Sequence, residues 1–137
     1  MTPEGKVKKN LKDFLKEYAK NVHFIGDVYA RWSKRQWRLY SHWPVLNGMG
    51  APELDCNITW YSRAISIECK APGKDFSARQ TLTTEDKMSA GGIVLGYRGA
   101  QDNTAVQEVL NYVADGDYNS ARIYAEKQLL SEGFVDA

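Results

Sequence analysis

The sequence has few of the residues that build disulfide scaffolds or zinc sites. It holds two cysteines, Cys56 and Cys69, and two histidines in 137 residues. Two cysteines make no disulfide framework, and no Cys/His spacing of the zinc-binding type occurs. A reducing, intracellular compartment therefore fits this chain best, and we expect it in a cytoplasm.

Long apolar runs are also lacking. No stretch approaches the roughly 18 apolar residues that a membrane-spanning helix needs, so we expect no membrane contact. The N-terminal segment is charged throughout and lacks the apolar centre of a secretory signal. The length, an apolar fraction of 43% and a charged fraction of 26% are ordinary for a globular protein. Residues 1–137 are therefore expected to form a single domain.

An overall excess of one charge is absent too, but the charges are unevenly distributed. The net charge is +1, yet residues 1–40 hold ten Lys/Arg against four Asp/Glu, and residues 101–137 hold two against seven. This asymmetry suggests a basic face that meets phosphates, although charges that only solvate helices give the same pattern. Residues 22–43 mix basic and aromatic side chains, which suits nucleic acid or, equally, a core of rings with exposed charges.

Apolar periodicity and turn residues predict eight elements in the order α, β, β, β, α, β, α, α. Thr2 and Pro3 start the first helix, and Ser77 caps the second. The expected helices cover 3–20, 78–90, a segment from Thr104, and 118–131. The expected strands cover part of 37–43, then 54–60, 65–70 and 93–97.

The strands over 54–60 and 65–70 read as a hairpin with one apolar and one polar face. Both cysteines lie on the apolar face and are interpreted as core residues. The apolar face holds Cys56, Ile58, Trp60, Ile65, Ile67 and Cys69. The polar face holds Asp55, Asn57, Thr59, Ser66, Glu68 and Lys70.

A turn centred on Ser62 and Arg63 would place Asp55 opposite Lys70 and diagonal to Glu68, roughly 7–8 Å away at the backbone. Two carboxylates at this separation, with a backbone carbonyl such as that of Cys69, suit Mg²⁺. The Lys70 ammonium could offset charge on a phosphate or orient a water. The alternative is a solvated polar face with a cross-strand Asp–Lys pair.

Three motifs resemble those of the PD-(D/E)XK nuclease superfamily, and within it the VRR-NUC group, especially its small stand-alone phage versions. The motifs are Gly50-Ala51-Pro52-Glu53-Leu54-Asp55, Ile67-Glu68-Cys69-Lys70-Ala71-Pro72-Gly73 and Ser77-Ala78-Arg79-Gln80. The resemblance covers residues 2–97. It implies a restriction-endonuclease-like α/β fold: a central mixed sheet with a catalytic hairpin, flanked by helices. Residues 1–97 would be the nuclease core and 98–137 a helical extension that closes the core or makes a dimer contact.

The resemblance also implies roles for single residues. Asp55 and Glu68 would bind Mg²⁺, with Mn²⁺ expected to substitute, and Lys70 would be the motif lysine. Glu4 matches the additional acid of the first helix, which supports the metal site, and Gln80 matches a glutamine that orients water or phosphate. Many family members have Asp directly after the proline, where this chain has Glu53. Asp55 is the preferred first acid and Glu53 the second choice.

The function expected from the resemblance is a magnesium-dependent DNA endonuclease. It would be selective for branched or Holliday-type junctions, act as a homodimer, and act in the host cell if phage-encoded. A dimer would bring two sites to two strands. One alternative is a non-catalytic DNA-binding module that keeps the nuclease fold. Another is an interaction domain whose hairpin acids are only surface charge.

Overall fold

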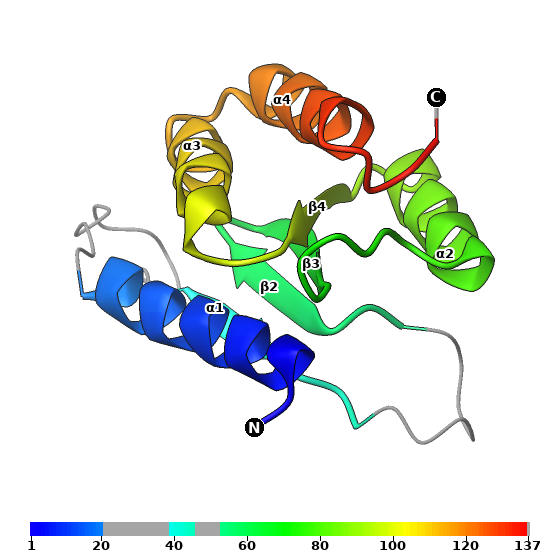
Figure 1. Ribbon diagram of the computed structural model, residues 1–137. Helices are drawn as coiled ribbons and strands as arrows, with labels where there is room; N and C mark the ends of the chain where they lie inside the picture. The colour runs from blue at the N-terminus through cyan, green and yellow to red at the C-terminus, as the bar shows by residue number, and fades with distance from the viewer. Residues whose placement is uncertain (21–38, 46–52, 137) are drawn as a thin grey trace.

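The computed structural model describes residues 1–20, 39–45 and 53–136, which form a mixed α/β domain (Figure 1). The basic and aromatic residues 22–38 and the predicted loop 47–52 lie outside this description. Four α-helices and a four-stranded sheet make up the described part, in the predicted order. The elements are α1 (Pro3–Ala19), β1 (Tyr40–His42), β2 (Cys56–Trp60), β3 (Arg63–Cys69), α2 (Ala78–Ser89), β4 (Ile93–Tyr97), α3 (Asn103–Ala114) and α4 (Tyr118–Ser131), with a 3₁₀ turn at Ala100–Asp102.

The sheet has the strand order β1-β2-β3-β4. The pairs β1/β2 and β2/β3 are antiparallel, whereas β3 and β4 run parallel. The parallel pair requires a crossover connection, and α2 provides it. The mixed sheet flanked by helices that the sequence predicts is therefore present.

The predicted hairpin register is wrong by two residues. The turn is centred on Tyr61 and Ser62, which both take positive φ (49° and 66°), as the central residues of a type I′ turn do. Cys56 pairs with Ile67, and one further step along this register brings Asp55 directly opposite Glu68. A shift by two preserves the alternation of faces, so each side chain keeps its predicted side.

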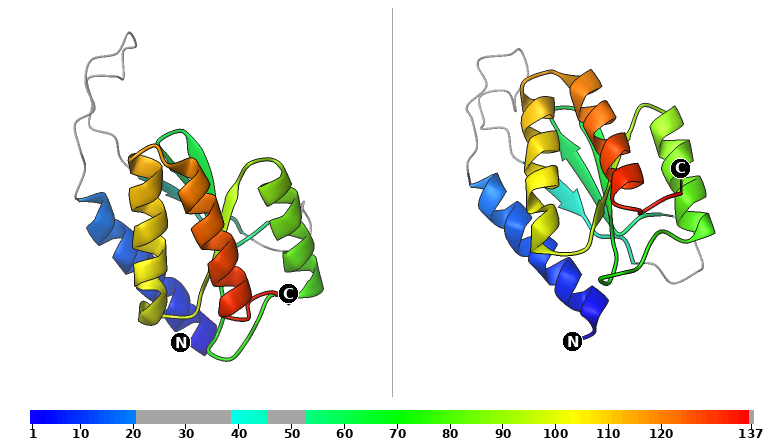
Figure 2. Two further views of the ribbon diagram at one scale, coloured as in Figure 1. Left: turned by 90° about the horizontal axis from the view of Figure 1, so that it is seen from above. Right: turned by 45° about the horizontal axis from the view of Figure 1, so that its top comes forward.

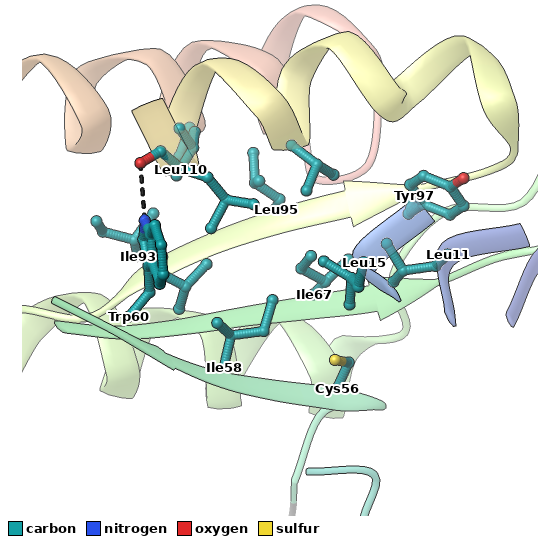
Figure 3. Packing of buried hydrophobic residues seen from close by; sticks show 14 of the residues in the cluster. Leu11, Leu15, Cys56, Ile58, Trp60, Ile67, Ile93, Leu95, Tyr97 and Leu110 are labelled. Atoms are coloured by element: carbon teal, nitrogen blue, oxygen red, sulfur yellow. Dashed lines mark hydrogen bonds between the residues drawn. The ribbon is translucent and has the colours of Figure 1, made fainter. Parts of the chain in front are cut away.

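The apolar face of the sheet carries the larger core, beneath α1, α3 and part of α4 (Figure 3). All six apolar hairpin residues are buried there, as the alternation predicts. The Trp60 indole donates to the backbone carbonyl of Leu110 at 2.9 Å, which satisfies its N–H and ties β2 to α3. The helices contribute Val7, Leu11, Leu15, Val106, Val109, Leu110, Val113, Ala121 and Ala125.

The opposite face of the sheet is covered by α2 and by the segment after α4, so that α2 lies across the sheet from α1 and α3 (Figure 1). A smaller cluster packs there, formed by Leu54, Phe76, Val94, Leu129 and Phe134. This is the face that carries the polar side chains of the hairpin, and Ser66 and Glu68 are buried in it. The alternative of a solvated polar face is therefore wrong for these two residues.

The C-terminal helices are integrated with the rest of the molecule. The Gln128 side-chain amide accepts from the Gly96 N–H at 3.0 Å and donates to the Gly96 carbonyl at 2.7 Å, so it pairs with the outer edge of β4. The Arg98 guanidinium lies over the Phe134 ring and donates to the carbonyls of Lys74 and Glu132. The Gln128 contact joins α4 to β4, and the Arg98 contacts join the residue after β4 to the segment after α4. Within the described ranges, no helix has the length and apolarity to cross a membrane.

Candidate active site

Asp55 and Glu68 lie side by side at the end of the hairpin remote from its turn. Asp55 directly precedes β2, and Glu68 is the last residue but one of β3. The Asp55 N–H donates to Glu68 Oε1 at 3.0 Å, and Asp55 Oδ2 accepts from the Cys69 N–H at 3.0 Å. Only 6% of Asp55 and 2% of Glu68 is exposed. The two predicted acids therefore form a buried carboxylate pair held by backbone N–H groups.

Gln80 joins this pair from the first turn of α2. Its side-chain N–H donates to Glu68 Oε2, while its own Oε1 accepts from the Ser77 N–H at 2.9 Å. Ser77 Oγ in turn accepts from the Gln80 N–H, which completes a capping box. The capping box thus holds the side chain that contacts Glu68. It also brings the first turn of α2 within side-chain reach of Glu68.

Burial and the neighbouring Asp55 charge raise the pKa of Glu68 to about 8. Burial has the larger effect, because a carboxylate loses its hydration in the interior. The Asp55 N–H and the Lys70 charge act in the opposite direction without cancelling it. Near neutral pH, this site therefore favours either a proton on Glu68 or an additional cation beside it.

Lys8 is a part of the site that the sequence analysis does not single out. Its Nζ lies 3.4 Å from Asp55 Oδ1, so α1 supplies a cation to the buried pair. Burial opposes the charged ammonium, but attraction to Asp55, with a further contribution from Glu4, raises the pKa of Lys8. Glu4 lies one helical turn before Lys8 and acts on it electrostatically. The four-residue spacing from Glu4 does not single Lys8 out in the sequence, because Lys9 has the same spacing to Asp13.

Lys70 follows β3 at the same end of the hairpin. Its backbone N–H donates to the Tyr97 carbonyl at 2.9 Å, which fixes the chain where it leaves the sheet. Its side chain is half-buried, and its charge lowers the pKa of Glu68. The lysine is thus positioned to act electrostatically at the carboxylate pair.

Glu53 has different partners from Asp55. Its Oε1 lies 2.8 Å from Lys87 Nζ and accepts from the Leu54 N–H at 2.9 Å. Burial opposes the ionised form, but these bonds hold the pKa of Glu53 below its ordinary value. Lys87 is seven residues beyond Gln80 on α2, about 10 Å along the helix axis. The structure therefore brings Asp55, and not Glu53, against Glu68.

Polar side chains also lie between α2 and the sheet, in the region between the Glu68–Gln80 contact and the Glu53–Lys87 pair. Asn57 Oδ1 accepts from Ser66 Oγ at 2.7 Å and from Lys87 Nζ at 3.3 Å. Thr84 lies on the same side of α2, one turn beyond Gln80. Its hydroxyl is buried, and it alone among the buried side-chain polar atoms of the described residues lacks a hydrogen-bond partner.

The two cysteines are core residues, as the alternation predicts. Cys56 and Cys69 are free and fully buried on the opposite face of the hairpin. Burial raises the pKa of both thiols, that of Cys56 to about 12. The thiol form therefore prevails at neutral pH, which removes the reactivity of a thiolate.

The oxygens of Asp55 and Glu68 suit a hard divalent cation. Among the described residues, each of the four carboxylate oxygens has a hydrogen bond or an ion pair with one partner, and a carboxylate oxygen can accept from two. Mg²⁺ in proteins is commonly held by one or two carboxylates, together with waters and substrate phosphate. Across 1–20, 39–45 and 53–136, no group of three or more His, Cys, Asp or Glu gathers into a cluster able to hold a metal. The pair thus fits a cation that keeps most of its water.

Comparisons with family models, with curated proteins and with solved structures find no match to this chain.

Proposed function

We propose that this protein is a magnesium-dependent DNA endonuclease with a restriction-endonuclease-like fold. The observation that carries the proposal is the buried pair of Asp55 and Glu68, with Lys70 at the same end of the hairpin. Two acids and a lysine at the end of a hairpin are the set that the sequence resemblance implies for phosphodiester hydrolysis.

The electrostatics of the pair support a metal. Two carboxylates close together and out of water repel each other, which contributes to the raised pKa of Glu68. A divalent cation held by Asp55 and Glu68 would offset this repulsion, with the Cys69 carbonyl as a further candidate ligand. Glu4 would support the site from α1, directly or through a water. When bound, Mg²⁺ supplies Lewis-acid stabilisation of the phosphoryl oxygens and lowers the pKa of a bound water.

The residues of the chain have separate roles in the proposed reaction. Lys70 stabilises the negative charge that grows on the phosphate and helps to orient the attacking water. Gln80 holds the Glu68 carboxylate in place, and Lys8 neutralises Asp55. A water loses a proton as its oxygen forms a bond to phosphorus, the bond from phosphorus to the 3′-oxygen breaks, and the departing 3′-oxygen takes up a proton from water. The products are a 5′-phosphate and a 3′-hydroxyl.

The proposed substrate is branched DNA, and the proposed active form is a homodimer. One small domain carries one such site, so cutting both strands of a junction at once requires two copies. The uneven charge supports a polyanionic partner, because the basic residues are concentrated in the first forty.

The test is cleavage of linear duplex, nicked plasmid and a four-way junction, with Mg²⁺, with Mn²⁺ and with EDTA. We expect metal-dependent cleavage, greatest on the junction. D55N, E68Q and K70A should abolish cleavage while DNA binding persists. E53Q is the matched control for D55N and should remain active, because Glu53 is paired with Lys87 and not with Glu68.

Two results would overturn the proposal. DNA binding without cleavage under every metal condition would instead establish a non-catalytic DNA-binding module. Full activity of E68Q would show that the reaction occurs at another place in the molecule.

A further inference from the structure

A groove lies between α1 and β1, and Lys8 of the same helix reaches the proposed active site. Its volume is about 280 Å³. Two lysines and a tryptophan, Lys12, Lys16 and Trp43, are among its lining residues. Its other described lining residues are Leu15, Ala19, Leu39 and Ser41. The right-hand view of Figure 2 shows α1 alongside the strand that forms the second wall.

Four lysines of α1 and its C-cap, Lys8, Lys9, Lys12 and Lys20, differ in their partners. Lys9 lies 2.8 Å from Asp13, and Lys20 lies 2.8 Å from Glu17, so these two pair with acids of their own helix. Lys8 and Lys12 instead reach away from the helix. Lys8 contacts Asp55, and Lys12 lies over the Trp43 ring at 4.7 Å from its centroid.

Lys8, Lys12 and Lys16 follow one another at four-residue spacing, which places them along one side of α1. Eight residues of helix span about 12 Å. The row of lysines therefore extends from the carboxylate pair to the groove over a distance that a few nucleotides of a DNA strand can cover. No carboxylate is among the described residues that line the groove. A row of lysines that starts at the site therefore continues along the groove, where Lys16 is close enough to Asp13 of the same helix to interact with it electrostatically.

We propose that this groove binds an unpaired DNA strand and directs it to the carboxylate pair. Phosphates contact Lys16 and Lys12. The Lys12 ammonium moves from the Trp43 ring to a phosphate, and a base takes its place on the ring, beside the apolar side chains of Leu15 and Leu39. This arrangement favours a single strand over a duplex, because the bases of a duplex are already stacked on one another. The inference deepens the proposed function, on which it rests, by specifying a substrate with a single-stranded arm beside the cleaved bond.

The test measures binding rather than cleavage, so that it is independent of the reaction. Fluorescence anisotropy would follow a labelled oligothymidine and a labelled duplex, both titrated with full-length protein carrying E68Q. Adding K12A and K16A should weaken oligothymidine binding about tenfold and reduce the salt slope by about 1.4, or about 0.7 for each lost phosphate contact. The duplex should lose less affinity. W43F should bind oligothymidine more tightly than W43A does.

The matched control is the K9A/K20A double substitution, which removes the same charge from the same helix. We expect less than a threefold effect, because these lysines face their own acids. Equal losses in the two double variants, or unchanged binding in K12A/K16A, would overturn the groove as the strand-binding site. If only the proposed reaction is wrong, the binding differences between the variants will still be observed, but the protein without substitutions will cut no DNA.

Discussion

The Gln80 side chain donates to Glu68 with one end and accepts from Ser77 with the other. A single residue thus completes the N-terminal cap of α2 and holds a carboxylate of the proposed site. Helix capping and the orientation of Glu68 are therefore coupled. Separate substitutions of Gln80 and Ser77 distinguish the two effects.

Gln80→Ala is expected to reduce cleavage about 10- to 100-fold, the effect usual for a residue that orients a metal ligand. Ser77→Ala is the matched control, because it removes the cap but keeps the Gln80 side chain. It should cost about 1 kcal/mol of stability and leave most of the cleavage activity. Initial cleavage rates and thermal melts of both variants check this. Equal losses of activity would mean that Gln80 acts only through the helix.

Stability should depend on pH through Glu68. Its folded-state pKa is about 8, above the ordinary value of 4.5. The folded protein therefore binds a proton more tightly than the unfolded chain, so this contribution to stability is present below about pH 4.5 and is lost as pH rises towards 8. Without divalent metal, the melting temperature should fall over this range. Glu68→Gln should flatten the fall, and a variant that keeps the full dependence would assign it to other groups.

Magnesium should oppose the same loss. A cation held by Asp55 and Glu68 stabilises the ionised pair, so added Mg²⁺ should raise the melting temperature more at pH 8 than at pH 5.5. Thermal melts of the wild-type protein and of Asp55→Asn check this. A magnesium effect of equal size in Asp55→Asn would show that the ion binds elsewhere.

Thr84→Val should stabilise the protein by about 1 kcal/mol. The Thr84 hydroxyl is buried without a partner, and valine has nearly the same shape without the polar group. Thr83→Val is the control, since the Thr83 hydroxyl donates to the Arg79 carbonyl at 3.1 Å and its loss brings no such gain. Urea denaturation measures both. Destabilisation by Thr84→Val would indicate that a bound water satisfies the hydroxyl.

Gly96→Ala should destabilise the fold by about 1–3 kcal/mol or more through overpacking. A Cβ at this position would lie 2.4 Å from atoms of the Phe134 ring. Phe134→Leu alone should also be destabilising, because that ring is fully buried. The double variant should lose less than the sum of the two single losses. Strict additivity in chemical denaturation would contradict the contact.

Much of the fold can be predicted from local patterns. The alternation of Cys56, Ile58 and Trp60 identifies the buried face of β2, and Ser77 identifies the start of α2. The register was missed because the turn uses Tyr61 and Ser62 at positive φ, without the Asn or Gly that commonly signals such a turn. The face to which a strand residue points depends only on whether its position is odd or even. An error of two residues leaves this unchanged, so the faces were still assigned correctly.

Contacts between distant segments account for the rest. Lys8 resembles the other lysines of α1 in the sequence, and only the packing of α1 beside the hairpin distinguishes it. Glu53 and Asp55 have the same parity, and the choice between them depends on Lys87, which is more than thirty residues away. No spacing rule connects such pairs, because they meet only when the tertiary structure forms.

The pairing of Gln128 with Gly96 limits how two copies of this protein can associate. A side-chain amide presents an N–H and a C=O side by side, as a backbone does, and here it replaces a neighbouring strand at the edge of β4. A second chain that extended the sheet across this edge would first have to displace both bonds and the helix that supplies them. Domain swapping and strand addition at β4 are thus disfavoured, so a functional dimer would have to form through other surfaces.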